Sequence, residues 1–381
     1  MSSHVLYRKY RPGGFDEIVG QEHIVQTLRH AIARGAVAHA YLFSGPKGTG
    51  KTTVARILAK AVNCEKAVAH EGNPRTQRAE QSSYDGDPCR ECGTCKDIEA
   101  GKALDIIEID AASNRGIDEI RELREGVRSS PMRLKYKVYI IDEAHQLTKE
   151  AFNALLKTLE EPPEHAIFIF ATTAADKMPA TILSRVQRFD FKKFTVAQIA
   201  GKLKKILKAE KMQADDDALG MIAYAAEGGL RDAESMLSQV LSHAAGQVTA
   251  ETVEEILGIV GFSQVSVFTD ILEKKDVKGA IVFLRALEEK GVSAEEFLKS
   301  LTQHLRKALL LSVDASLRDA VVPELTDDQF RAIMSHVKRF AASELTRMLS
   351  AFIEAQDMMR KTPIAFLPLE LALFKLYTEQ H

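Results

Sequence analysis

The first 180 residues alternate between two patterns of apolar and polar positions. Four short runs are apolar almost throughout, as expected of strands buried on both faces of a parallel sheet. These runs are residues 40–45, 104–110, 137–142 and 165–173. Residues 148–161 instead repeat apolar side chains at helical spacing, with Thr148 able to cap the start of a helix and Pro162 able to end it. Repeated strand–helix units predict a doubly wound α/β domain.

The pattern changes near residue 194, beyond which only helical periodicity remains. Residues 195–243 predict a few short helices, and 246–381 predicts longer ones, including a helix that opens with a capping box at Ser293. We therefore expect three parts. They are an α/β domain with a parallel sheet over residues 1–179, a small helical domain over 180–243 and an all-helical domain over 244–381.

A glycine-rich segment follows the first predicted strand. The stretch "GPKGTGKT" satisfies G-x-x-x-x-G-K-[ST] and precedes a helical pattern, the context in which this motif binds nucleotide phosphates. Lys51 would reach the β- and γ-phosphates, and the Thr52 hydroxyl would ligate Mg²⁺. A glycine-rich turn without a ligand is the alternative. The expected ATP-binding residues are Gly45, Pro46, Lys47, Gly48, Thr49, Gly50, Lys51, Thr52 and Thr53.

An acidic pair ends the third predicted strand. In "VYIIDEAH", Asp142 is placed to hold Mg²⁺ through water, and Glu143 is placed to polarise the attacking water. The alternative is a pair that only caps a turn. The next strand ends at Thr172 and Thr173, and either hydroxyl could orient the water or simply finish the strand. Together with Lys51, these residues predict a magnesium-dependent ATPase site.

All four cysteines fall in one constellation. Cys64 ends the helix after the phosphate loop, and "CRECGTC" supplies Cys89, Cys92 and Cys95. Thiolates at C-x-x-C spacing favour a closed, structural zinc site in a small module at about residues 64–100. An iron–sulfur cluster is the alternative, and a disulfide fits a reducing compartment poorly. The polar insertion at 66–88 lengthens the spacing from Cys64 to Cys89, but a flexible loop loses little entropy on closing.

The net charge and the lengths of the apolar runs limit which classes of partner this chain can bind. Lys and Arg number 51 against 53 Asp and Glu, a net charge of −2, so nucleic-acid contact needs a local basic patch. The basic stretch at 192–211 is either a solvated helix face or such a patch. No apolar run reaches membrane-spanning length, and the start lacks the apolar core of a signal peptide. We therefore expect a cytoplasmic protein with no membrane partner.

The motifs occur in the order used by AAA+ ATPases: the phosphate loop, "IIDEAH", "ATT", "LSR" and "GGLRD". With "YRKYRP" (7–12), "IVGQEHIVQTL" (18–28) and "LLKTLEEPP" (155–163), the chain resembles the gamma/tau subunits of bacterial DNA polymerase III, which are clamp-loader ATPases. The resemblance covers nearly the whole chain and is weakest in the last third. It implies an AAA+ domain with a zinc module, a helical lid and a helical collar.

The resemblance also assigns roles to individual residues. It places five residues around the adenine and ribose: Tyr7, Arg8, Arg11, Val19 and Gly20. Thr173 would be the polar sensor that follows the γ-phosphate. Arg231 of "GGLRD" would reach from the lid to the phosphates, with a solvated helix arginine as the alternative.

In the resembling family, the Ser-Arg pair of "LSR" lies at the subunit surface and completes the ATP site of the neighbouring subunit. This assigns Arg185, for which the sequence offers no obvious local carboxylate partner, to a catalytic role in trans as an arginine finger. A plain surface arginine is the alternative. The family usually has Cys where this chain has Val186, and we assign Arg188 a structural role.

Three residues before the helix that follows the second strand suit a DNA phosphate. Ser113, Asn114 and Arg115 would lie at a helix N-terminus, and the resembling family turns such positions toward primer-template DNA. Ordinary helix capping with a solvated arginine explains them equally well. No aromatic residues interleave with the basic ones, so readout of a DNA sequence is not expected.

The expected function is that of a clamp-loader ATPase subunit. Its implied partners are subunits of the delta and delta-prime type, further copies of the chain in a pentameric ring, a sliding clamp and primed DNA. One alternative is a branch-migration motor, which needs a winged helix where residues 246–381 predict only helices. The other is a nucleotide-sensing scaffold with little hydrolysis, which the intact Lys51, Asp142 and Glu143 argue against.

Overall fold

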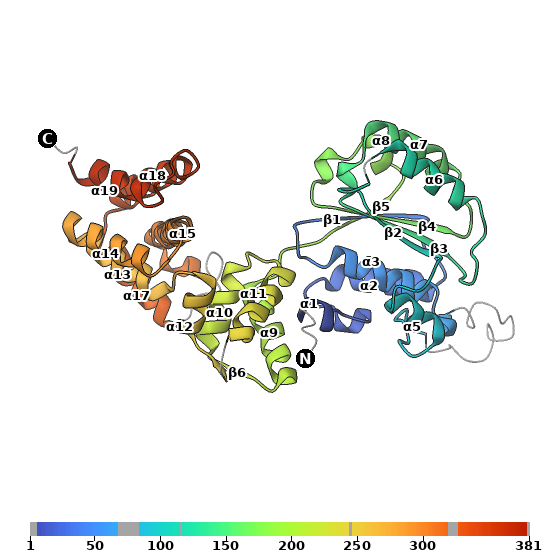
Figure 1. Ribbon diagram of the computed structural model, residues 1–381, viewed down its shortest axis with the longest axis horizontal. Helices are drawn as coiled ribbons and strands as arrows, with labels where there is room; N and C mark the ends of the chain where they lie inside the picture. The colour runs from blue at the N-terminus through green and yellow to red at the C-terminus, as the bar shows by residue number, and fades with distance from the viewer. Residues whose placement is uncertain (1–5, 68–83, 115, 244–245, 319–326, 379–381) are drawn as a thin grey trace. The chain divides into compact units, whose positions relative to one another are not determined.

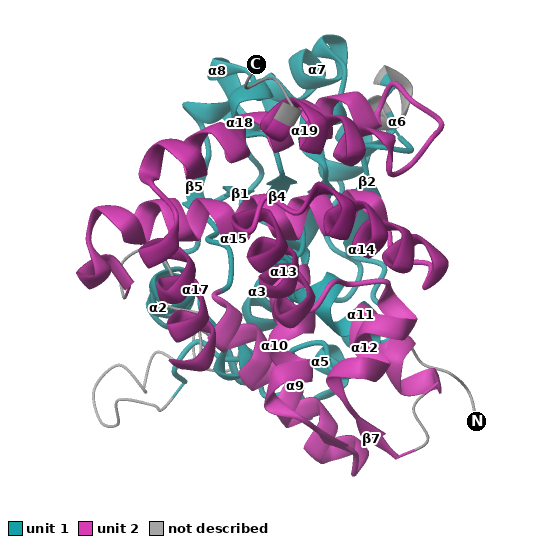
Figure 2. Cartoon of the chain, turned by 90° about the vertical axis from the view of Figure 1, so that its left-hand side faces the viewer, with its two compact units in different colours: residues 1–194, 226–235 teal, residues 195–225, 236–381 magenta. Residues whose placement is uncertain are grey.

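The computed structural model of the chain describes residues 6–67, 84–114, 116–243, 246–318 and 327–378. The chain divides into two compact units, which Figure 2 shows in different colours. The first unit comprises Met1–Phe194 with Ala226–Ser235, and the second comprises Thr195–Ala225 with Met236–His381. Most of the polar insertion predicted at 66–88 lies outside the described residues.

A parallel sheet with strand order β2-β3-β4-β1-β5 forms the centre of the first unit (Figure 1). Its strands are β1 (Ala40–Ser44), β2 (Ile106–Asp110), β3 (Lys137–Asp142), β4 (Ala166–Thr172) and β5 (Gln187–Asp190). The central strands β1 and β4 are buried at every position. The prediction of burial on both faces is wrong for β2, which leaves Glu108 and Asp110 exposed because it is an edge strand.

Helices cover both faces of this sheet. In Figure 1, α2 and α3 lie on one face, and α6, α7 and α8 lie on the other. Side chains from β1 alternate between the two cores, since Tyr41 and Phe43 pack with α2 and α3 whereas Leu42 packs with α7. The helices and short helical turns of the unit are α1 (Leu6–Lys9), η1 (Phe15–Glu17), α2 (Glu22–Ala33), α3 (Lys51–Val62), α5 (Gly93–Glu99), α6 (Ile117–Val127), η2 (Ala144–Gln146), α7 (Lys149–Glu160), η3 (Ala175–Lys177) and α8 (Ala180–Leu183).

The cap predicted for α7 is confirmed. The Thr148 hydroxyl accepts a hydrogen bond from the Ala151 N–H (3.2 Å), and the helix ends at Glu160, just before the two prolines. Its apolar face buries Phe152 and Leu155 against the sheet. This packing helps to fix the carboxyl ends of the strands, where the following loops can form a ligand-binding site.

The second unit is largely helical. Its elements are α9 (Val196–Glu210), α10 (Asp216–Ala225), α11 (Leu230–His243, whose first residues belong to the first unit), α12 (Ala250–Leu257), α13 (Phe262–Glu273), α14 (Val277–Glu289), α15 (Ala294–Val313), η4 (Ala315–Leu317), α17 (Asp327–Arg339), α18 (Ala342–Met359) and α19 (Leu367–Thr378). The prediction of helices alone beyond residue 194 is wrong in one detail. Gln213–Ala214 (β6) and Gln247–Val248 (β7) pair as a parallel two-stranded sheet, too short to leave an alternating pattern.

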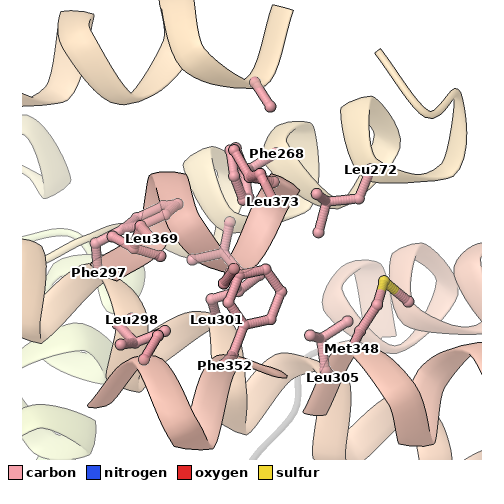
Figure 3. Close-up of a cluster of buried hydrophobic side chains, with 14 of the residues drawn as sticks. Phe268, Leu272, Phe297, Leu298, Leu301, Leu305, Met348, Phe352, Leu369 and Leu373 are labelled. Atoms are coloured by element: carbon pink, nitrogen blue, oxygen red, sulfur yellow. The ribbon is translucent and has the colours of Figure 1, made fainter. Parts of the chain in front are cut away.

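A large core of the second unit is built from α13, α14, α15, α17, α18 and α19. Ser293 caps α15, as predicted, by accepting a hydrogen bond from the Glu296 N–H (3.4 Å). Figure 3 shows the buried cluster, which includes Phe268, Leu272, Phe297, Leu298, Leu301, Leu305, Met348, Phe352, Leu369 and Leu373. No single described helix is long and apolar enough to cross a membrane, and only the bent pair of α12 and α13 passes by length and composition.

Candidate nucleotide and metal sites

The phosphate loop follows the carboxyl end of β1. Three of its glycines have positive φ: Gly45 at 146°, Gly48 at 77° and Gly50, the N-cap of α3, at 93°. A Cβ on Gly45 would lie 2.5 Å from the Phe191 carbonyl oxygen, and one on Gly48 would lie 2.9 Å from the Gly229 Cα. The loop therefore needs glycine both for its backbone conformation and for close approach to its neighbours.

Lys51 is folded against this loop. Its Nζ donates hydrogen bonds to the carbonyl oxygens of Gly45 (2.7 Å) and Pro46 (2.8 Å), and the residue is 6% exposed. Burial lowers the pKa of this ammonium group. The Thr49 hydroxyl also donates to the Pro46 carbonyl (2.9 Å), and Thr53 lies in the first turn of α3. A phosphate would give Lys51 a stronger, charged partner than two carbonyl oxygens.

The start of α3 meets the end of β3. The Thr52 hydroxyl donates to Oδ2 of Asp142 (2.8 Å), while Oδ1 of the same carboxylate accepts from the Glu143 N–H (2.9 Å). Hydroxyl and carboxylate oxygens side by side are ligands suited to Mg²⁺. The two residues predicted to hold the ion are therefore adjacent.

Glu143 has a left-handed backbone (φ 45°, ψ 42°), which is uncommon for a residue other than glycine. Its Oε2 accepts a hydrogen bond from the Thr173 hydroxyl (2.9 Å) and lies 3.4 Å from Nδ1 of His145. The same His145 nitrogen lies 3.0 Å from the Thr172 hydroxyl. The two threonines therefore have different partners. Sequence reasoning missed His145, because nothing in the "DEAH" spacing shows that its ring turns back toward Glu143.

Tyr7 and Arg231 come together although they are distant in sequence. The Arg231 guanidinium carbon lies 4.6 Å from the centroid of the Tyr7 ring, and that of Arg8 lies 5.8 Å from it. Hydrogen bonding to Arg231 and to Arg8 lowers the pKa of Tyr7. Arg231 is exposed and also stacks on the Tyr7 ring, so both its predicted role at the nucleotide and the alternative of a solvated helix arginine stay open.

The first turn of α11 contacts the phosphate loop. The Leu230 N–H donates to the Gly48 carbonyl oxygen (3.1 Å), and Lys47 Nζ lies 3.6 Å from a carboxylate oxygen of Asp232. The Lys47–Asp232 pair was not predicted, since no local pattern connects residues so far apart in the chain. A change in the position of this first turn would therefore shift the phosphate loop.

Two of the predicted adenine residues, Val19 and Gly20, lead into a residue that bonds to the segment after β5. Val19 and Gly20 precede Gln21, which is fully buried and bonds to the backbone of Lys192 in both directions. Its Nε2 donates to the Lys192 carbonyl oxygen (2.8 Å), and its Oε1 accepts from the Lys192 N–H (3.3 Å). Burial lowers the pKa of Arg11. Gln21 was not predicted as a site residue, although it fixes the position of its two predicted neighbours.

The four cysteines form one cluster. Their sulfur atoms all lie within 4.8 Å of one another, and all four are free thiols. Backbone N–H groups of Cys89, Cys92 and Cys95 donate to the sulfurs of Cys64, Cys89 and Cys92 respectively, each at 3.4 Å. Four thiolates about 2.3 Å from a zinc ion would have sulfurs about 3.8 Å apart. The cluster therefore fits a closed, four-coordinate metal.

Arg185 has a carboxylate partner that is distant in sequence, so the prediction that it has no local one stands. Its Nη2 donates to Oε1 of Glu160 (2.7 Å), and its Nη1 donates to two oxygens at the end of α8. Glu160 is 25 residues upstream, in "LLKTLEEPP", and reaches Arg185 only because α7 packs against α8. Arg188 pairs with Asp190 (2.8 Å), which accords with a structural role.

The turn after β2 is organised by Asp110. Its Oδ2 accepts from the Ser113 hydroxyl (3.1 Å), and its carbonyl oxygen accepts from the Asn114 N–H (2.9 Å). Neither residue caps α6, whose N-cap is Gly116, so the capping alternative is wrong in detail. Arg115 lies outside the described residues. In the basic stretch, α9 buries its apolar residues and exposes several lysines, so it has a charged face.

Three family models match successive parts of the chain. They are described as DNA polymerase III, delta subunit (residues 20–195), DNA polymerase III clamp loader subunit, ATPase lid domain (198–246), and DNA polymerase III subunits gamma and tau domain III (248–380). The gamma subunit of DNA polymerase III from Buchnera aphidicola subsp. Acyrthosiphon pisum is 40% identical over 305 residues, which is 80% of each chain. The chain belongs to the gamma/tau family of DNA polymerase III subunits.

Two longer gamma/tau relatives are tau subunits. That of Bacillus subtilis is 42% identical over 381 residues, all of this chain and 64% of the relative, and that of Escherichia coli is 39% identical over 82% of this chain and 46% of the relative. The chain thus spans less than two thirds of their length. Among solved structures, the Holliday junction branch migration motor RuvB from Thermotoga maritima is similar to this chain with a TM-score of 0.48 and 20% sequence identity. The similarity covers 69% of this chain and 79% of RuvB.

Membership of the gamma/tau family favours the clamp-loader interpretation over the branch-migration alternative. One of the matching family models is described as an ATPase lid domain. The residues brought together at the ends of β1, β3 and β4 have the chemistry that ATP hydrolysis needs.

Proposed function

We propose that this chain is an ATPase subunit of a bacterial DNA polymerase III clamp loader. In this role, binding and hydrolysis of ATP drive the opening of a sliding clamp and its loading onto primed DNA. The observation that carries the proposal is the convergence of the phosphate loop, the Thr52–Asp142 contact and Glu143 at one edge of the sheet, within a gamma/tau chain.

Each residue of this edge has a distinct part in hydrolysis. The loop N–H groups and Lys51 hold the phosphates, and Thr52 with Asp142 would hold Mg²⁺, which would supply charge neutralisation at the phosphate oxygens. Glu143 takes a proton from the attacking water as the γ-phosphate bond breaks. Thr173, already hydrogen-bonded to Glu143, follows the γ-phosphate and turns Glu143 toward the water.

Two arginines connect the site to larger movements. Arg231 reports the nucleotide to the lid, because α11 contacts both Tyr7 and the phosphate loop. Arg185 completes the site of the next subunit and must leave Glu160 to do so. The chain therefore hydrolyses ATP in company, in a pentameric ring that contains copies of itself and subunits of the delta and delta-prime type.

Zinc at the cysteine cluster is part of the proposal. The four thiols offer a closed tetrahedral site with no open position, so the metal would be structural. In the proposed ring, the lid over residues 180–243 is the part that moves with the nucleotide, and the collar over 244–381 is the part that stays fixed. We place the protein in the bacterial cytoplasm. Ser113, Asn114 and Arg115 are candidate contacts to primed DNA, which would be bound without sequence specificity.

The test is ATP hydrolysis by the assembled complex, measured alone and with both a sliding clamp and primed DNA. We expect the pair to stimulate hydrolysis well beyond either component, and Lys51→Ala to abolish the stimulated rate. An assembled wild-type complex whose rate ignores the pair would overturn the clamp-loader proposal. A complex that binds ATP without measurable hydrolysis would favour the scaffold alternative.

A further inference from the structure

The cysteine module contacts the segment that leads into the nucleotide site. Arg90 lies between two of the thiols, and its guanidinium donates to two carboxylates of η1. Nη1 bonds to Oε1 of Glu17 (2.7 Å), and Nη2 bonds to Oδ2 of Asp16 (2.8 Å). The backbone of Arg90 is left-handed (φ 63°), which is uncommon for a residue other than glycine. The forked side chain is thus held toward η1.

A second contact joins the same two segments. Oδ1 of Asp87 accepts a hydrogen bond from the Phe15 N–H (2.6 Å), at the first residue of η1. A Cβ built on Gly14 would lie 3.0 Å from that carboxylate oxygen, so the backbone there lies directly against the module. The approach is close enough that movement of residues 87–90 would move the turn.

A third contact runs through α3. The Lys60 ammonium group is almost fully buried and donates to the Gly13 carbonyl oxygen (3.2 Å) and to Oε2 of Glu99 (3.0 Å), the last residue of the module helix α5. Residues 13–17 are therefore tied to the module at three points. Just beyond them, Val19 and Gly20 lead to Gln21, which is fixed to the segment beside the phosphate loop.

We propose that metal binding by the four cysteines sets the affinity of the nucleotide site, with Arg90 as the positioning residue that connects them. This inference rests on the proposed nucleotide and zinc sites. A shared metal fixes Cys89 and Cys92 and so fixes the residue between them, which holds η1 and the adenine residues that follow. Without the metal, this segment gains conformational freedom that nucleotide binding must remove.

The fold itself does not depend on this connection. Phe15 is 1% exposed and packs in the core formed with α2 and α3, so the turn stays anchored when Arg90 is changed. An exposed ion pair contributes little by itself. The proposed effect therefore appears in nucleotide affinity and in its dependence on metal.

The test compares Arg90→Asn with wild type, using the full chain, its zinc content and its affinity for a fluorescent ATP analogue. Asparagine tolerates a left-handed backbone but cannot reach both carboxylates. We expect unchanged zinc content and a dissociation constant raised about fivefold, the lower end of site–site coupling. The matched control is Arg133→Ala, which removes an exposed pair with Asp97 (3.9 Å) on the same module and should leave the affinity unchanged.

Chelation of zinc, followed by removal of the chelator, provides the second arm. It should weaken nucleotide binding by wild type at least as much as Arg90→Asn does, and weaken binding by the variant much less, because the connection is already cut. If Arg90→Asn loses zinc, the double variant Asp16→Asn/Glu17→Gln takes its place, since it leaves the module intact.

The outcomes separate the two proposals. If the wild-type chain binds no nucleotide, both the proposed nucleotide site and this inference are wrong. If the zinc-loaded Arg90→Asn variant binds nucleotide as tightly as wild type does, the inference is overturned and the proposed function still stands. Equal weakening by Arg133→Ala would also overturn it, because the effect would then be a general one of the module.

Discussion

The two units of the molecule use buried polar groups in opposite ways. In the first, the buried Lys51 ammonium group donates to two carbonyl oxygens and is close enough to Glu143 and Asp142 to feel their charge. In the second, His304 and His336 are 4% and 1% exposed and bond to each other (3.0 Å), and His336 bonds to Asp270 (3.1 Å). The first group lies at a glycine-rich loop of the kind that binds phosphate, whereas the second links three helices although Nδ1 of His304 has no hydrogen-bond partner.

The difference shows when a buried polar group points to function. Lys51 begins the helix that follows a glycine-rich loop at the end of a strand, an arrangement that binds phosphate. The histidines lie between α13, α15 and α17, where their hydrogen bonds fix the packing of the helices. Burial alone would have marked both as candidate sites. The partner groups distinguish them.

The contrast predicts the largest effect at Glu143. Glu143→Gln should lower ATP hydrolysis by the assembled complex about 10²- to 10⁴-fold, because the amide cannot take a proton from water. Nucleotide affinity should change little, since Lys51 and the loop remain. Steady-state hydrolysis and binding of an ATP analogue check this. A variant that hydrolyses at the wild-type rate would remove Glu143 from the chemistry.

Removal of zinc should destabilise the first unit alone. A metal held at a thousand times its dissociation constant stabilises the folded form by about 4 kcal/mol. Hydrogen exchange should therefore rise in α5 and at the end of α3 after chelation, while α15 in the second unit provides an internal control. Faster exchange in both regions, or in neither, would contradict a local structural metal.

The histidine pair should make the second unit sensitive to acid. Burial lowers the pKa of His304 to about 3, and burial also lowers that of His336 against the opposing charge of Asp270. Both take up protons near pH 6.5 when unfolded, whereas burial disfavours the protonated form of each in the folded chain. Because the unfolded state binds more protons, stability is greatest above pH 6.5 and is lost as the pH falls.

From pH 7.5 to 5.5, His304 alone should lower the free energy of unfolding by about 1.4 kcal/mol. Urea unfolding at the two pH values measures this, and His304→Gln should remove about 1.4 kcal/mol of the wild-type change. Charged groups facing the pair are Lys307, Asp270, Glu273 and Arg339. If the variant keeps the full wild-type slope, those groups and not the histidine carry the pH dependence.

The smallest effect is expected at Glu160. Its pair with Arg185 is partly exposed, and such pairs contribute about 0.2–1 kcal/mol. Glu160→Gln should therefore free Arg185 at little cost in stability and raise hydrolysis in the assembled complex by up to about fivefold, the equivalent of 1 kcal/mol. Slower hydrolysis would mean that Glu160 orients the arginine and does not withhold it.

The sequence predicted what is local and missed what packing creates. Strands such as 137–142 were visible because a buried parallel strand is a continuous apolar run, and the phosphate loop is a motif with a fixed spacing. Exposure of β2 depends on strand order, which no run of residues encodes. The contacts of Arg185, Arg90 and His304 join residues 25 or more positions apart and have no local signature.

The central claim is that Arg185 acts on the nucleotide of another subunit, and a mixing experiment tests it most directly. Arg185→Ala and Lys51→Ala chains are each assembled alone with the partner subunits and then assembled together. We predict that either variant alone is nearly inactive and that the mixture regains ATP hydrolysis, because an intact finger then meets an intact phosphate loop. A fully assembled mixture as inactive as its components would contradict the claim.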